Sequence, residues 1–104
     1  MPTDGELDAL IEQITVDAYG DESYWSFRQA FEDDVVFPFD ATLVGVPISV
    51  TGIDFDGDER RGLVAIVQRN GVMATISLLD IEVPGTEPTA NRLVAAYRRW
   101  LGIA

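Results

Sequence analysis

The sequence has no histidine, no cysteine and no lysine among its 104 residues. Without cysteine the chain cannot form a disulfide, a thiolate nucleophile, a zinc finger or an iron–sulfur site. Without histidine it lacks the usual general base near neutral pH and the usual transition-metal ligand. Oxygen donors remain, and these suit Ca²⁺ or Mg²⁺. The absences therefore favour oxygen-based metal binding and argue against an enzyme.

Positive charge is also scarce. The chain has seven arginines against eighteen aspartates and glutamates, which gives a formal net charge of -11 at pH 7. Such a surface repels nucleic acid and anionic membranes, and it attracts cations or basic partners. Salt-adapted proteins are acidic too, but that explanation fits scattered charge better than clustered charge. We expect no nucleic-acid partner and no membrane partner, and the sequence identifies no protein partner.

Long apolar runs are absent. No run approaches the roughly 20 residues that a membrane span requires, and residues 1–6 are acidic where a signal peptide is basic. These features predict a cytoplasmic protein. The length suits one small domain with a single core, so we expect residues 1–104 to form one domain.

Helices are predicted at both ends of the chain. Apolar residues recur at helical spacing over residues 6–18, and Gly20 breaks this pattern. Asp21 can cap a second helix over residues 22–32. A third helix starts near Thr86 or Pro88 and ends at Gly102.

The middle of the chain is predicted to form strands. Pro38 and Pro47 disfavour helix, and β-branched residues alternate from residue 42 onward. Asp56-Gly57 and Asn70-Gly71 each signal a tight hairpin, with strands over residues 60–68 and 72–77. Residues 78–80 form one helical turn before a last strand at residues 81–83. The predicted fold is α+β, with two N-terminal helices, a small SH3-like antiparallel barrel or bent sheet of 4–5 strands, and a C-terminal helix.

The most informative feature is an acidic turn in which four carboxylates occupy six consecutive positions, at Asp54, Asp56, Asp58 and Glu59. The three aspartates match the first ligands of an EF-hand loop. The pattern then fails, because the sixth position is glutamate instead of glycine and the twelfth is Ala65 instead of a bidentate glutamate. The turn is therefore not an EF-hand.

Two interpretations of this turn stay open. In a hairpin that turns at Asp56-Gly57, Asp54 lies opposite Glu59, close enough to share a cation. Alternatively, the turn is a solvated hairpin tip whose charge Arg60 and Arg61 neutralise, and taken alone this is the commoner situation.

A second acidic cluster ends the second helix and leads into the sheet. It comprises Glu32, Asp33, Asp34 and Asp40. Carboxylates at a helix C-terminus oppose the helix dipole, and most such clusters are solvated helix ends. Since Ca²⁺ needs six to eight ligands, this cluster could supply oxygens that the acidic turn lacks. A paired-carboxylate hydrolase is a weaker alternative, because no pocket-forming architecture is visible.

Several segments in order resemble one family, the small acidic calcium-binding proteins called CcbP, first recognised in cyanobacteria. The segments are VDAYG at 16–20, WSFRQAFED at 25–33, PFD at 38–40, DFDGDERRGL at 54–63 and AAYRRWLG at 95–102. The resemblance implies a cytoplasmic Ca²⁺ buffer that holds calcium with acidic surface side chains. The acidic turn and residues 32–40 match the acidic motifs of the family.

The sequence thus leads to two functional hypotheses. The first is a non-EF-hand calcium-binding protein that buffers or sequesters Ca²⁺ through clustered carboxylates. The second is an interaction module without metal, in which an SH3-like barrel presents an acidic rim to a basic partner. The sequence does not separate Ca²⁺ from Mg²⁺ or give the number of ions.

Overall fold

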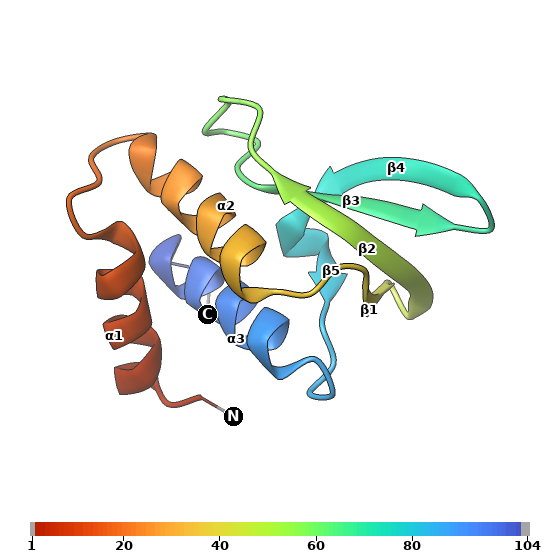
Figure 1. Cartoon of the computed structure of the whole chain (residues 1–104), viewed down its shortest axis with the longest axis horizontal. Helices are drawn as coiled ribbons and strands as arrows, with labels where there is room; N and C mark the ends of the chain where they lie inside the picture. Colours follow the sequence, from red (N-terminus) through yellow and green to blue (C-terminus); the bar gives the residue numbers. More distant parts are fainter. Residues whose placement is uncertain (1, 103–104) are drawn as a thin grey trace.

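In the computed structural model, which describes residues 2–102, three helices lie together on one side of a five-stranded antiparallel sheet (Figure 1). The helices are α1 (Asp4–Thr15), α2 (Glu22–Asp34) and α3 (Pro88–Trp100). The strands are β1 (Phe39–Leu43), β2 (Val46–Asp54), β3 (Val64–Arg69), β4 (Val72–Ser77) and β5 (Ile81–Glu82), with the short 3-10 turn η1 (Leu78–Asp80) before β5. The expected α+β fold is confirmed.

Helix α1 is shifted toward the N-terminus relative to the prediction. It begins after Thr3, whose Oγ1 accepts a hydrogen bond of 3.2 Å from the Glu6 N–H. It ends at Thr15, because Asp17 adopts a left-handed backbone with φ 62°. The helix therefore stops before Gly20, and the predicted end at residue 18 was wrong.

Helix α2 runs two residues beyond the predicted end. Repulsion among its last carboxylates is relieved within the helix, since Arg28 pairs with Glu32 at 3.0 Å and the Gln29 amide donates to Asp33 at 2.9 Å. The predicted cap was wrong: Asp21 has a helical backbone and its side chain makes no capping hydrogen bond.

The sheet is open and is not a barrel. Its strand order is β4-β3-β2-β1-β5, so β4 and β5 form opposite edges. The Asn70-Gly71 hairpin is confirmed: Arg69 pairs with Val72, and both turn residues have positive φ, 52° and 79°. Strand β4 and the turn η1 also occur where the sequence predicted them.

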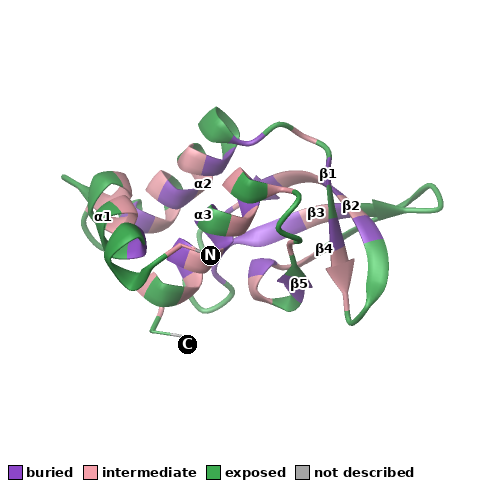
Figure 2. Ribbon diagram, turned by 90° about the horizontal axis from the view of Figure 1, so that it is seen from below, coloured by how far each residue is buried: buried purple, intermediate pink, exposed green. Residues whose placement is uncertain are grey.

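The core lies between the helices and one end of the sheet (Figure 2). Phe27, Phe31, Val50, Leu63 and Tyr97 are each at most 1% exposed. Helix α1 packs on α2 and α3, and α2 packs on β2. Within residues 2–102 there is no helix that is both long and apolar enough to cross a membrane.

Candidate metal-binding site

Asp54 is the last residue of β2, and the other three carboxylates of the acidic turn lie in the long connection to β3. We call residues 54–62 the acidic loop. The predicted two-residue hairpin at Asp56-Gly57 was wrong, since Asp54 pairs with Val64 and not with Glu59. The reason is burial. Phe55 is 1% exposed and stacks on Tyr24 of α2 at 4.9 Å between ring centroids. Anchoring this ring in the core keeps the chain from turning directly after it.

The acidic loop is shaped by its own aspartates. Asp56 Oδ1 accepts a hydrogen bond of 2.9 Å from the Asp58 N–H, and Asp58 Oδ1 accepts one of 3.0 Å from the Arg60 N–H. The Asp58 carbonyl also accepts from the Gly62 N–H at 3.0 Å. The two hydrogen bonds accepted by Oδ1 atoms form Asx-type turns, in which a carboxylate takes the place of a backbone acceptor. One oxygen of each aspartate is used in this way, and the second oxygen of Asp56 lies 3.2 Å from Arg61 Nη1.

The end of the acidic loop is held by the core. The buried Tyr97 hydroxyl of α3 accepts a hydrogen bond of 2.9 Å from the Leu63 N–H. Burial raises the pKa of Tyr97, and the Leu63 hydrogen bond opposes this rise. Gly62 has φ 67°, and a side chain there would collide with the Tyr97 hydroxyl. The loop therefore leaves the rigid core at Asp54 and returns to it at Leu63.

Tyr24 lies beneath the acidic loop. Its hydroxyl donates to the Glu59 carbonyl at 3.4 Å, and its ring contacts Trp100 of α3. Burial raises the pKa of Tyr24, and the negative charge of Glu59 raises it further, because both disfavour the phenolate.

Arg28 of α2 joins the two acidic clusters. Its Nε donates to Asp54 Oδ1 at 3.1 Å, and its Nη1 lies 3.0 Å from Glu32 Oε2. The Arg28 side chain is 29% exposed, and its two partners are about half exposed. A positive group thus lies where carboxylates from two different elements converge.

A second arginine balances the loop itself. Arg61 Nη1 lies 3.2 Å from Asp56 Oδ2, and both side chains are roughly half exposed. The neutralisation of the loop by arginine that the sequence suggested is therefore present at Asp56. Asp58 and Glu59 have no arginine partner among the ion pairs of residues 2–102.

The other three candidate residues lie away from the acidic loop. Asp33 and Asp34 border a groove between α2 and α1, lined also by Leu10 and Ile14. Asp40 is exposed on β1, opposite Ser49. The acidic loop contacts Tyr24, Trp25 and Arg28 in the first half of α2. Asp34 lies six residues beyond Arg28, about 9 Å farther along the helix axis and away from the acidic loop (Figure 1).

The carboxylates are not gathered into a ready cation cage. Within residues 2–102, no three acidic side chains lie close enough together to hold a metal ion without movement. Glu32 and Asp54 are bridged by one guanidinium, that of Arg28.

Sequence reasoning missed Arg28, Tyr24 and Tyr97. A local signal existed for the first one, because Arg28 and Glu32 have the i,i+4 spacing of a helical ion pair. Its second partner, Asp54, lies 26 positions away. The aromatic contacts of Tyr24 and Tyr97 with the loop also depend on tertiary structure and leave no pattern in the sequence.

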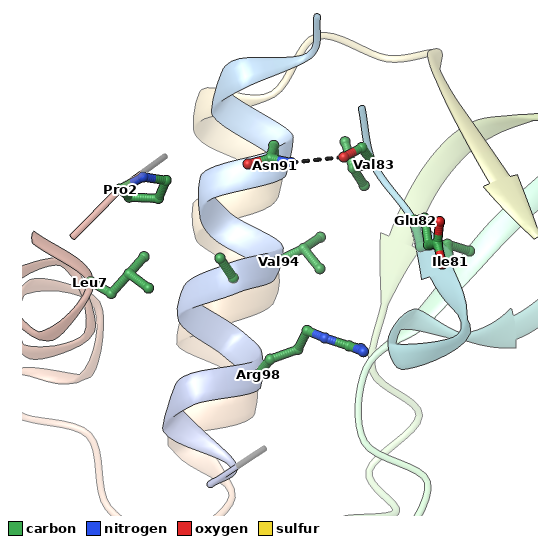
Figure 3. Close-up of a pocket in the computed structure, with 9 residues that line it drawn as sticks. Pro2, Leu7, Ile81, Glu82, Val83, Asn91, Val94 and Arg98 are labelled. Carbon is green, nitrogen blue, oxygen red and sulfur yellow. Dashed lines mark hydrogen bonds between the residues drawn. The ribbon is translucent and has the colours of Figure 1, made fainter. Parts of the chain in front are cut away.

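An apolar cleft near the helices is a poorer candidate for a cation. It has a volume of about 360 Å³ and lies between α1, α3 and β5 (Figure 3). The Asn91 amide donates to the Val83 carbonyl at 2.7 Å, and Arg98 donates to the Leu79 carbonyl at 2.9 Å. Glu82 is the only carboxylate among the residues that line it. One carboxylate begins only a small part of the six- to eight-oxygen shell that Ca²⁺ requires.

Comparison with known proteins identifies the fold. No protein-family model and no curated protein matches the sequence. The crystal structure of Anabaena CcbP matches with a TM-score of 0.79 and 22% identity, over 99% of this chain and 94% of that one. A calcium binding protein in its calcium-binding form matches with a TM-score of 0.76 and 22% identity, over 100% of this chain and 99% of that one. The chain therefore has the fold of these proteins, as the sequence resemblance implied.

Proposed function

We propose that this protein binds Ca²⁺ at the acidic loop, with Asp54, Asp56, Asp58 and Glu59 as ligands and Glu32 of α2 as a fifth. The bridge formed by Arg28 carries the proposal, because it marks a point where carboxylates from α2 and from the acidic loop meet around a positive group. The fold shared with a calcium binding protein in its calcium-binding form supports the choice of ion.

The chemistry of the ligands favours a hard cation. Ca²⁺ takes six to eight oxygens in flexible geometry, and waters and backbone carbonyls of the loop complete a shell that five carboxylates begin. Arg28 and Arg61 leave their partners when the ion enters, since a divalent cation placed between carboxylates compensates more charge than a guanidinium does. Asp33, Asp34 and Asp40 are candidate ligands for a second ion at the far end of α2.

The properties of such a site suit a buffer. Its ligands are exposed and stay partly hydrated, so we expect an affinity on the order of micromolar to sub-millimolar that weakens with added salt. The loop has none of the later EF-hand positions and precedes a strand instead of a helix. We therefore propose a cytoplasmic, non-EF-hand Ca²⁺ buffer without catalytic activity.

Calorimetric titration of Ca²⁺ tests the site. Asp56→Asn and the double variant Glu32→Gln/Asp54→Asn should each weaken binding at least tenfold or remove one ion from the stoichiometry. Glu12→Gln is the matched control, because it removes one charge from the exposed side of α1 and should change the affinity less than twofold. Equal titrations for all four proteins would exclude the acidic loop as the site.

A further inference from the structure

One end of the sheet is left uncovered by the helices. In Figure 1 the β3–β4 hairpin extends away from the helical layer. The core face of the sheet continues there as an apolar groove of about 540 Å³. We call it the β4 groove, and its walls include Val46, Ile48, Val67, Val72, Ala74 and Ile76.

The outer wall of the β4 groove is an unprotected strand edge. Strand β4 pairs only with β3, and the six residues of the pairing run without a register shift. It carries no charge and no proline, and Val72 and Met73 are 69% and 61% exposed. Natural edge strands are normally shortened, charged or kinked against pairing, and the opposite edge, β5, has only two residues.

The charge distribution is compatible with a partner of the same charge at this part of the surface. None of the eighteen carboxylates lies in residues 60–79, which include β3 and β4, and none lies in residues 41–53. In a chain of net charge -11, a second copy that approaches along β3 and β4 meets no carboxylate from these segments.

From these observations we propose that β4 pairs antiparallel with β4 of a second copy, which gives a symmetric dimer with one continuous ten-stranded sheet. In an antiparallel pair, residues directly opposite each other project from the same face of the sheet. Because the two faces alternate along β4, the two-fold axis of the dimer must pass through a residue and not between two residues. A register centred on Ala74 places Val72 beside Ile76 of the second copy. The two β4 grooves then merge, and they supply apolar area beyond the strand edge alone.

The same register is electrostatically permitted. Arg69 lies opposite Val72 on β3, and the two copies of Arg69 would be roughly 20 Å apart, given about 3.4 Å per residue and 4.8 Å per strand. This exceeds the Debye length of about 10 Å at 0.1 M salt. In this register, each Arg69 lies toward the end of the second copy's sheet that carries its acidic loop. At that end, Asp54, Val64 and Ser77 are in register across β2, β3 and β4.

Sedimentation equilibrium of the full chain tests the dimer. The wild type should show twice the chain mass of 11.4 kDa at high concentration. Val72→Lys/Met73→Lys should weaken dimerisation at least tenfold, whereas Val16→Lys, at another exposed valine, should leave it unchanged. Because both copies are acidic, added NaCl should strengthen the dimer. A wild-type monomer at all concentrations, or a dimer that tolerates the double variant, would overturn the proposal.

Hydrogen exchange gives an answer that does not depend on the variants. In the wild type, amides of β4 should become protected as the protein concentration rises, while amides of the acidic loop should not change. Protection of β4 that is independent of concentration would also contradict the dimer. The proposal does not rest on calcium binding, so both measurements are made in the presence of a chelator.

Discussion

Arg28 has an electrostatic role that differs from that of an ordinary surface arginine. Its guanidinium contacts Asp54 and Glu32 at 3.1 and 3.0 Å, on two elements that are separate in the sequence. A cation held by the chain itself relieves carboxylate repulsion in the absence of metal. The same cation must be displaced before Ca²⁺ can use these oxygens. Arg28 therefore stabilises the metal-free fold and competes with the metal.

Replacing Arg28 should strengthen calcium binding. In Arg28→Gln the competitor and one positive charge are removed, and an exposed ion pair contributes roughly 0.2–1 kcal/mol. We expect the Ca²⁺ affinity to rise by up to about fivefold, measured by calorimetric titration, and the melting temperature without calcium to fall. Arg92→Gln on α3 is the control for the change in net charge and should alter neither quantity much. Weaker binding in Arg28→Gln would mean that Arg28 positions the ligands instead of competing with the ion.

At the residue scale, sequence reasoning found the carboxylates but not their environment. The spacing of Asp54, Asp56 and Asp58 was sufficient to mark the loop as a candidate. It could not show that Asp54 is paired with a residue 26 positions earlier. Ion pairs of this kind are set by how α2 packs on β2, and no local pattern encodes that packing.

The contact between the end of the acidic loop and α3 depends on one glycine. A side chain at Gly62 would have to adopt φ 67° and would collide with the Tyr97 hydroxyl, which bonds the Leu63 N–H. Gly62→Ala should therefore lower the free energy of unfolding by roughly 3 kcal/mol, from backbone strain together with the loss of a buried hydrogen bond.

Gly71→Ala separates the effect of backbone strain from the effect of losing the Tyr97 hydrogen bond. Gly71 has a similar φ of 79°, but a side chain there meets no atom within 4 Å. We expect the free energy of unfolding to fall by only about 1 kcal/mol, because backbone strain is the sole cost at this position. Urea unfolding of both variants measures the difference. Equal losses would show that Tyr97 moves aside at no cost.

Helices α1 and α3 are joined by an ion pair that should respond to pH. Arg99 donates to Asp8 Oδ1 at 2.7 Å and to Oδ2 at 3.1 Å. These hydrogen bonds hold the pKa of Asp8 below its ordinary value of 3.8. A lowered folded-state pKa stabilises the fold above pH 3.8, and this contribution is lost as the pH falls through the folded-state pKa.

Asp8→Asn should therefore melt at a lower temperature than the wild type at neutral pH. The gap should close below pH 3.8, where the wild-type carboxylate takes up its proton. Thermal melts across pH 2–7 measure this, with Glu12→Gln on the same helix as the control. A gap that persists at pH 2 would assign the loss to packing and not to the charge of Asp8.

The predicted turns and strands were correct where local backbone preferences determine the structure, and wrong where burial of a side chain determines it. Asn70-Gly71 turns the chain as expected, because both residues tolerate positive φ. Asp56-Gly57 carries a similar signal and fails, because the buried ring of Phe55 outweighs the preference of the dipeptide. The open sheet could not be distinguished from a barrel by sequence, since closure depends on whether β4 reaches β5.

At the scale of the whole molecule, two effects of salt act in opposite directions. Screening weakens the attraction of Ca²⁺ to the acidic loop, but it also reduces the self-repulsion of a chain of net charge -11. A rise in stability with added ions is therefore not by itself a sign of a binding site. Specific binding and general screening can be separated only at equal ionic strength.

The melting temperature should therefore rise more with CaCl₂ than with NaCl of the same ionic strength. Binding to the folded state raises the free energy of unfolding by RT ln(1 + [L]/Kd), which is about 2.7 kcal/mol when the free Ca²⁺ concentration is one hundred times Kd. For a chain of this size, that corresponds to a rise on the order of 10 °C. In Glu32→Gln/Asp54→Asn the extra rise should disappear and the response to NaCl should remain. An identical response of the wild type to both salts would assign the acidic surface to salt adaptation or to a basic partner, because screening does not distinguish the loop carboxylates from the rest.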